Sequence, residues 1–340
     1  MGASEIREKL LAKSKEKTGW KEGDLLGTGS TLLNLAITDN WRGGFAKGLY
    51  ILFVGDSQSG KTFFCLTCFA EAAANPAFDE YRLIYDAVEG GALMNLEKFF
   101  GKKVAERIES PCYEDGIPQS SQTVEEFYFN LDDALDNKRP CIYVLDSMDS
   151  TTSAREEKKF DENKKAVQGG GQGKGDFADG KAKANSQGLR NVLHKIRDTK
   201  SILIIINQTR DNVDGGMFAP QKTRSGGRAL TFYASVEIWS SVGQKIKKNV
   251  NGKDRVIGVT SRLQVKKNRM TGKERTIEVP IKYSYGIDDL ASCVEYLIDE
   301  SYWKKGRTID ITKDFPDIAP ATKNALIRKL EEAGAEVELK

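Results

Sequence analysis

Continuous apolar runs separated by helix-forming segments are the feature that most constrains the fold of this chain. The runs LYILFVG, RLIYDA, CIYVLD and SILIIIN follow one another between residues 49 and 207. Strands of this kind are buried on both faces, which is typical of parallel sheets with helical crossover connections. The intervening segments KTFFCLTCFAEAAA, VEEFYFNLDDALD and SQGLRNVLHKIRD have the pattern of helices. We therefore predict an α/β fold with a mostly parallel sheet covered by helices on both faces.

The chain changes character after Val236. Residues 235–242, 262–269 and 276–284 have the pattern of strands joined by short polar turns, which predicts an antiparallel extension of the sheet. The chain ends in an amphipathic segment that we expect to form a helix followed by a strand or coil. The predicted domains are a short N-terminal arm over 1–25, a core over 26–286 and a small C-terminal module over 287–340.

Composition narrows the class of protein. Apolar residues make up 39% and charged residues 30% of the 340 residues, as in ordinary soluble globular proteins. A net charge of +3 does not by itself establish a nucleic-acid partner, so the placement of the cations has to decide. No apolar run approaches the roughly 20 residues of a membrane-spanning helix, and the N-terminus lacks the apolar centre of a signal peptide. We therefore expect a cytoplasmic protein with no membrane partner.

The five cysteines are odd in number and scattered, which favours a reduced, cytosolic protein. Cys65 and Cys68 form a C-x-x-C pattern, for which a redox or zinc site has to be weighed. No second cysteine pair or histidine cluster completes a metal site, so we favour core packing on a helix. His194, the single histidine, is interpreted as a surface or packing residue.

The segment GDSQSGKT matches the phosphate-binding pattern G-x-x-x-x-G-K-[ST]. It follows a predicted strand and opens a predicted helix, where backbone N–H groups and the helix N-terminus attract phosphate. Lys61 is expected to bridge the β- and γ-phosphates of ATP, and the Thr62 hydroxyl to ligate Mg²⁺. The predicted nucleotide-binding residues of this loop are Gly55, Asp56, Ser57, Gln58, Ser59, Gly60, Lys61 and Thr62.

Carboxylates follow two other predicted strands. Asp146 ends the run CIYVLD, where an unpaired buried charge would be costly, so we predict that it holds the metal together with Thr62. Hydrolysis also needs a group that orients or deprotonates water. In the segment LIYDAVEGG, Asp86 and Glu89 come at or just after the end of another predicted strand, and either could serve. Each could instead be a helix N-cap or turn carboxylate.

Two further segments carry polar or basic residues behind predicted strands. Gln208 directly follows the run SILIIIN, and its neutral amide could report the presence of a γ-phosphate to the basic loop over 209–228. Residues 153–185 are rich in lysine and glycine, which predicts a flexible loop that is either functional or a solvated insertion.

With these motifs the chain resembles the RecA-type homologous recombinases, particularly their bacterial and phage branch. The resemblance covers most of the chain, from GTGSTLLNLAI to YSYGIDDLASCVEYLID. Its most specific part is the ordered set YVLDS, IIINQTR, MFAPQKTRSGGRALTFYASV and VKKNR. It implies that the N-terminal arm links protomers.

The resemblance implies a role for each residue of the ATP site. Asp146 would be the Walker B carboxylate and Gln208 the γ-phosphate sensor. Glu89 is preferred over Asp86 as the catalytic carboxylate. In the family the catalytic glutamate directly follows an Asp-Ala pair, whereas in this chain Val88 stands between that pair and Glu89. The resemblance also predicts that two cations complete a neighbouring subunit's site and that an aromatic residue contacts the base or ribose. These residues are Lys267, Arg269 and Tyr283.

The two DNA-binding loops of the family fall on the segment 153–185 with the helix after it, and on the segment 209–228. Cations and backbone N–H groups would contact phosphates, and Met217 and Phe218 would lie against bases. Those two residues could instead form a small apolar anchor for the loop. The predicted DNA-binding residues are Lys183, Arg190, Arg210, Met217, Phe218, Lys222, Arg224, Gly226, Gly227 and Arg228.

The function implied by the resemblance is a DNA-dependent ATPase that uses ATP and Mg²⁺. It would form a helical filament on single-stranded DNA and promote pairing with homologous duplex DNA. Two alternatives stay open. One is a hexameric motor of the helicase type with the same ATPase fold, and the other is a recombination mediator that binds ATP and DNA without turnover.

Overall fold

A computed structural model describes residues 20–21, 23–90, 95–137, 139–169, 180–211, 222–300, 309–310 and 337–338. Most of the predicted N-terminal arm, most of the C-terminal module, and both Met217 and Phe218 lie outside the described residues. Within the described part, no helix is both long and apolar enough to cross a membrane.

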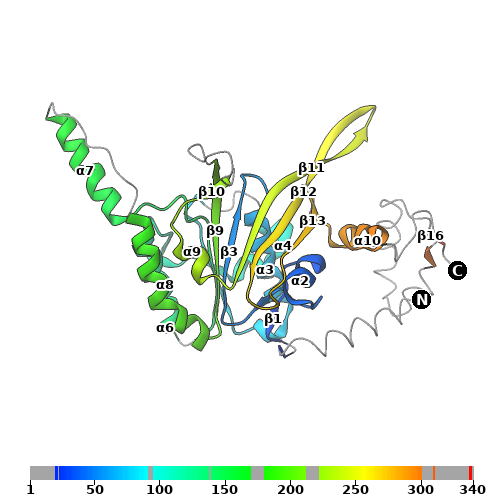
Figure 1. Cartoon of the computed structure of the whole chain (residues 1–340), viewed down its shortest axis with the longest axis horizontal. Helices are drawn as coiled ribbons and strands as arrows, with labels where there is room; N and C mark the ends of the chain where they lie inside the picture. The colour runs from blue at the N-terminus through cyan, green and yellow to red at the C-terminus, as the bar shows by residue number, and fades with distance from the viewer. Residues whose placement is uncertain are drawn as a thin grey trace.

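One large sheet organises the molecule (Figure 1). Six neighbouring strands run parallel to one another. In spatial order they are β11 (Val236–Val250), β3 (Tyr50–Gly55), β9 (Ile202–Asp211), β8 (Cys141–Leu145), β4 (Arg82–Asp86) and β5 (Ile108–Glu109). The predicted extension continues the sheet beyond β11 in antiparallel fashion. It consists of β12 (Lys253–Asn268), β13 (Arg275–Lys282) and β14 (Gly286–Ile287).

Helices cover both faces of the sheet because its central strands are apolar on both. On β3, Ile51 and Phe53 pack into one core with α3 (Lys61–Ala74) and α2 (Thr31–Thr38). The alternate residues Leu52 and Val54 pack into a second core with α6 (Val124–Asp136) and α8 (Gly180–Asp198). Successive side chains of a strand point to opposite faces, so one apolar run supplies both cores. The predicted α/β fold is confirmed.

The prediction of a loop over residues 153–185 was wrong for much of its length. Residues Ala154–Gln168 form α7, and α8 already begins at Gly180. A capping box between Ser153 and Glu156 starts α7, and this local signal outweighs the polar composition. Figure 1 shows α7 projecting from the body of the molecule.

The second predicted loop is likewise partly strand. β9 continues past Gln208 to Asp211 and pairs antiparallel with β10 (Lys222–Arg224). Residues at both ends of the predicted DNA loop therefore form a hairpin, which we call the β9–β10 hairpin. Pairing with β10 provides backbone hydrogen-bond partners for the polar end of β9, and the apolar pattern of the sequence did not predict this pairing.

The remaining elements are short. They are β1 (Leu25–Leu26), β2 (Phe45–Ala46), α4 (Leu96–Phe100), α5 (Lys102–Arg107), β6 (Cys112–Glu114), β7 (Ile117–Gln119), α9 (Ala229–Tyr233), α10 (Asp289–Asp299), β15 (Ile309–Asp310), β16 (Val337–Glu338) and the 3₁₀ helix Pro76–Phe78. Asp289 at the start of α10 accepts hydrogen bonds from the backbone N–H (2.6 Å) and hydroxyl (2.7 Å) of Thr31. This helix therefore packs on the core, although the predicted boundary assigns it to the C-terminal module.

Cys65 and Cys68 are buried in the core around α3, which confirms the packing interpretation. His194 is exposed on α8, as expected.

Candidate functional site

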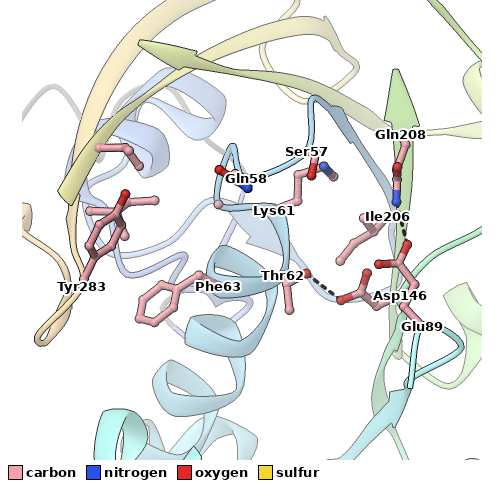
Figure 2. Close-up of a pocket in the computed structure, with 13 residues that line it drawn as sticks. Ser57, Gln58, Lys61, Thr62, Phe63, Glu89, Asp146, Ile206, Gln208 and Tyr283 are labelled. Carbon is pink, nitrogen blue, oxygen red and sulfur yellow. Dashed lines mark hydrogen bonds between the residues drawn. The ribbon is translucent and has the colours of Figure 1, made fainter. Parts of the chain in front are cut away.

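A pocket of about 490 Å³ opens at the carboxyl end of β3, β8 and β9 (Figure 2). Ligands of parallel α/β sheets bind at this edge, because the loops that follow the strands converge there. The residues that line it are Ser57, Gln58, Gly60, Lys61, Thr62, Phe63, Glu89, Asp146, Ile206, Gln208, Val259, Ile281 and Tyr283.

The predicted phosphate loop has the geometry that its sequence requires. Gly60 has φ of +90°, and a Cβ there would lie 2.5 Å from Ile281 Cδ1, so only glycine fits easily. The next residue begins α3, so the first residues of this helix, Lys61 and Thr62, line the pocket. Lys61 Nζ donates to the carbonyl oxygens of Gly55 (3.0 Å) and Asp56 (2.7 Å). Burial lowers the pKa of the Lys61 ammonium, against the opposing charges of nearby carboxylates.

Asp146 and Thr62 meet at the floor of the pocket. The Thr62 hydroxyl donates to Asp146 Oδ2 at 2.7 Å, and Tyr85 donates to the same oxygen at 2.9 Å. Burial raises the pKa of the Asp146 carboxyl, although these hydrogen bonds oppose the shift. A hydroxyl and one carboxylate suit Mg²⁺, which usually keeps several waters and substrate phosphates as ligands. The described residues contain no cluster of three or more acidic, cysteine or histidine ligands, as an all-protein cage would need.

Asp86 and Glu89 differ sharply in position. Asp86 is fully buried and accepts hydrogen bonds from the Ser121 backbone and hydroxyl and from Tyr143. Glu89 lines the pocket and faces Gln208. The geometry therefore favours Glu89 as the group that could act on a water in the pocket.

Three donors converge on one oxygen of Glu89. Gln208 Nε2 lies 2.7 Å from Oε1, the Ser147 hydroxyl 2.6 Å and the Ser150 hydroxyl 2.9 Å. Burial pushes the pKa of Glu89 upward, but these hydrogen bonds and the charge of Lys61 outweigh it, so the pKa lies below its usual value. Glu89 is therefore a carboxylate at neutral pH. Ser147 and Ser150 were missed by sequence reasoning, because only the turn after β8 brings them to Glu89.

Three of the predicted nucleotide-binding residues do not line the pocket. A Cβ on Gly55 would lie 1.9 Å from Ser240 Oγ, so this glycine permits the close approach of β3 and β11. Ser59 is buried, and its hydroxyl lies 2.7 Å from that of Ser240. Asp56 points instead toward the β9–β10 hairpin. These residues therefore support the phosphate loop on the side away from the pocket.

Two carboxylates fasten the β9–β10 hairpin to the nucleotide site, and sequence reasoning missed both roles. Asp56 of the phosphate loop accepts from Thr209 at 2.5 Å and from Lys222 at 2.6 Å to each oxygen. The pKa of Asp56 is lowered, because these partners outweigh the effect of burial.

Asp149, in the turn after β8, is the second carboxylate. It accepts from the backbone N–H of Gln208 at 2.5 Å, from Arg210 at 3.3 Å and from the Ser225 hydroxyl. Its side chain is only 9% exposed. Both flanks of the hairpin are therefore attached to the pocket that contains Gln208.

Part of the predicted DNA-binding set is internal. The Arg224 side chain is 10% exposed and donates to the carbonyl of Gly227 at 3.0 Å and to the Thr231 hydroxyl. Gly226 and Gly227 have φ of +83° and +81°, and a Cβ on either would lie 2.6 Å from a neighbouring side chain. Asn185 donates to the carbonyl of Gly226 at 3.0 Å. In this structure these residues hold the segment against α8 and α9.

The other predicted cations are at the surface, whereas Met217 and Phe218 lie outside the described residues. The exposed predicted cations are Lys183, Arg190, Arg210, Lys222 and Arg228. Arg210 and Lys222 have the carboxylate partners described above, so a phosphate would have to replace those contacts.

Lys267 and Arg269 do not line the pocket of their own chain. Lys267 Nζ donates to the carbonyls of Thr231 (2.5 Å) and Phe232 (2.9 Å), and Arg269 donates to Phe232 at 2.7 Å. Cations at a helix C-terminus are favourable, so both stabilise the end of α9. Their predicted role in a neighbouring subunit stays a prediction.

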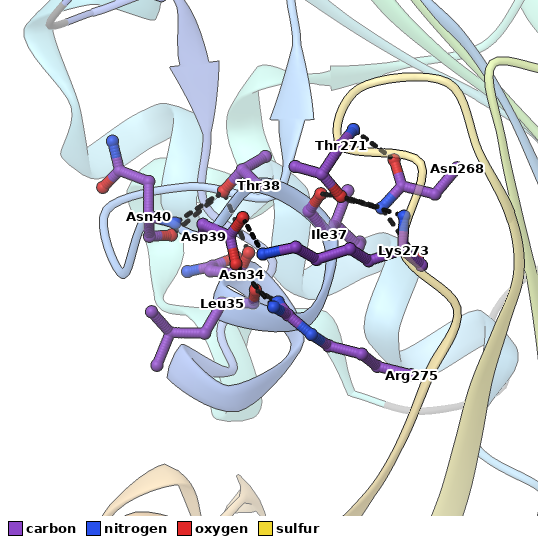
Figure 3. A network of polar contacts seen from close by, with 10 residues as sticks. All are labelled: Asn34, Leu35, Ile37, Thr38, Asp39, Asn40, Asn268, Thr271, Lys273 and Arg275. Carbon is purple, nitrogen blue, oxygen red and sulfur yellow. Dashed lines mark hydrogen bonds and ion pairs between the residues drawn. The ribbon is translucent and has the colours of Figure 1, made fainter. Parts of the chain in front are cut away.

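The turn that follows these two cations is fixed against α2 (Figure 3). Lys273 and Arg275 bind the two oxygens of Asp39 at 2.8 Å and 2.7 Å. Asn268 donates to the carbonyl of Ile37 at 2.8 Å. The pKa of Asp39 is lowered, because the hydrogen bonds and charges of Lys273 and Arg275 exceed the effect of burial. The network gives the turn a defined position.

Tyr283 lies at the opposite wall from Gln208 and is 57% exposed, with Phe63 beside it in Figure 2. This wall presents two aromatic rings where a base or ribose could lie. The sequence predicted Tyr283 here but not Phe63, whose place in an apolar helical run gave no signal.

The chain is similar in sequence to known proteins. The family model of the RecA N-terminal domain matches residues 165–288. The proteins named Protein RecA of Streptococcus uberis and of Streptococcus pyogenes serotype M5 are each 29% identical to the chain over 282 residues. The aligned region covers 81% of this chain and 65% of each relative.

Proposed function

Because the chain is similar to proteins of the RecA family, we propose that it is an ATP-dependent DNA recombinase. In this proposal it assembles into a helical filament on single-stranded DNA, hydrolyses ATP at subunit interfaces and pairs the bound strand with homologous duplex DNA. We propose the cytoplasm as its location.

The observation that carries the proposal is the convergence of five side chains in one pocket. They come from the phosphate loop, from the ends of β8 and β9 and from the turn after β4, and they are Lys61, Thr62, Glu89, Asp146 and Gln208. A phosphate loop alone is common to many ATPases. The contact of 2.7 Å between Gln208 and Glu89 adds a neutral amide on the candidate base.

Each residue has a chemical role in this proposal. Lys61 would move from the loop carbonyls to the phosphates, and Glu89 would orient a water and accept its proton. Gln208 would exchange its hydrogen bond with Glu89 for one to the γ-phosphate. Mg²⁺, held by Thr62 and Asp146, would supply charge neutralisation at the phosphates.

The β9–β10 hairpin would connect the pocket to DNA. Gln208 lies in β9, and its backbone and side chain are held by Asp149 and Glu89. A change in the Gln208 contacts would therefore act on Arg210 and Lys222, which are exposed and suited to phosphates. ATP binding and DNA binding would favour the same arrangement of the hairpin.

The test is a steady-state ATPase assay with and without single-stranded DNA at low salt. We expect hydrolysis to rise with added DNA and to be abolished by Lys61→Ala. A rate that is indifferent to DNA would argue for another kind of motor, and tight ATP binding without turnover for a mediator. Electron microscopy with DNA and a non-hydrolysable ATP analogue would separate open helical filaments from closed rings.

A further inference from the structure

The hairpin formed by β11 and β12 carries cations on one face. In its outer part Lys248 pairs opposite Arg255, and Val250 opposite Lys253. Directly opposite residues of an antiparallel pair share a face, and so do residues two apart on one strand. These four side chains therefore lie on one face, with three cations and no carboxylate. We call it the basic face.

The opposite face of the same ribbon carries a smaller excess of positive charge. It carries Lys247 opposite Val256 and Asn249 opposite Asp254. With Lys245, which lies two residues before Lys247, this face has two cations and one carboxylate, against three cations and no carboxylate on the basic face. Asn249 Nδ2 donates to Asp254 Oδ1 at 3.1 Å. The excess of positive charge is therefore concentrated on one side of the ribbon, the basic face.

The ribbon is a defined element that extends from the sheet in Figure 1. Its tip residues Asn251 and Gly252 have φ of +54° and +76°, which is the pattern of a tight type I′ hairpin turn. Gly252 N–H also donates to Asn249 Oδ1 at 3.1 Å. Lys248, Lys253 and Arg255 are exposed.

The charges of the three cations of the basic face are not neutralised by the described part of the chain. No described residue forms an ion pair with Lys248, Lys253 or Arg255. Lys248 lies directly opposite Arg255, and like charges in that position are destabilising. An anion from outside would relieve this repulsion.

The chemistry of the ribbon selects among anionic partners. Residues 240–261 contain no aromatic side chain, whereas proteins that hold single strands commonly stack bases on aromatic rings. A two-stranded ribbon fits the major groove of B-form DNA. We propose that the basic face binds the phosphate backbone of duplex DNA, with the ribbon lying along the major groove; DNA as the class of partner rests on the proposed function.

The test measures binding of the full chain to a labelled DNA duplex by fluorescence anisotropy, over a range of salt and without nucleotide. In Lys248→Gln/Lys253→Gln/Arg255→Gln we expect weaker binding and a salt slope shallower by about 2.7, since each phosphate contact contributes about 0.9. The control variant Lys98→Gln/Lys102→Gln/Lys103→Gln removes the same charge from α4 and α5. Lys247→Gln tests the opposite face, and both should bind as the unmodified chain does.

Several outcomes would overturn the inference. They are an unchanged duplex affinity and slope, an equal loss in the control variant, or an equal loss of affinity for an A-form RNA duplex, whose major groove is too narrow for the ribbon. The triple variant should unfold at the same temperature or higher, because it loses a repulsion. A chain that binds duplex DNA in this way but hydrolyses no ATP would contradict the proposed function and support this inference.

Discussion

Asp86 and Glu89 lie three residues apart, yet their surroundings differ. Asp86 is buried and accepts hydrogen bonds from three donors. Glu89 faces the pocket, and its charged form accepts hydrogen bonds from Ser147, Ser150 and Gln208. A carboxylate that is already ionised and faces the space for substrate can accept a proton. One that is buried and fully bonded serves the fold.

We expect Glu89→Gln to lower kcat by about 10² to 10⁴, the usual contribution of a general base, with ATP affinity nearly unchanged. Asp86→Asn should instead lower the free energy of unfolding by about 1–3 kcal/mol, because an amide cannot accept from all three donors. Turnover per folded molecule and chemical denaturation measure the two effects. The opposite pattern would assign the catalytic role to Asp86.

The β9–β10 hairpin is the element that joins the nucleotide pocket to the candidate DNA surface. Its attachment through Asp56 is partly exposed, with side-chain exposures of 25% for Asp56 and 45% for Lys222. An exposed ion pair is weak, so a DNA phosphate can compete with Asp56 for Lys222.

This competition makes a prediction about DNA affinity. Asp56→Asn should release Lys222 and raise the affinity for single-stranded DNA by a factor of about 1.4 to 5, since such pairs are worth about 0.2–1 kcal/mol. Lys222→Gln should lower it, and the double variant should match Lys222→Gln alone. The pKa of Asp56 is lowered, so the pair should persist as pH falls to its usual pKa of 3.8 and be lost only below it. If Asp56→Asn also raises affinity in the Lys222→Gln background, another cation is responsible.

At the scale of the whole molecule, one chain holds only part of the proposed site. Lys267 and Arg269 contact the end of α9 in their own chain, away from its pocket, and the turn that follows them is fixed by Asp39, Lys273 and Arg275. A head-to-tail assembly could bring them to the next subunit's nucleotide.

Mixing two inactive variants tests this arrangement. Lys61→Ala removes the phosphate lysine, and Lys267→Ala/Arg269→Ala removes the two cations. If the cations act across the interface, an equal mixture should recover up to about a quarter of the normal ATPase rate, because one interface in four then combines intact halves. Melting temperatures check that both variants fold. If two folded variants give no recovery of activity, the two cations act on the nucleotide of their own chain or have a structural role only.

The sequence by itself determined the α/β class, the strands and helices of the core, the phosphate loop and the candidates Asp146 and Gln208. These features depend on local periodicity, which can be read directly from the sequence, and on the rule that parallel strands end at the same edge of a sheet. Composition misjudged residues 154–168, because a capping box can start a helix in a polar segment. Only the tertiary structure placed Glu89 in the pocket and Asp86 in the core, buried the Arg224 side chain, and paired Asp56 with Lys222 across 166 residues of sequence. Such choices depend on burial and on distances between segments that are remote in the chain, and neither is encoded in local pattern.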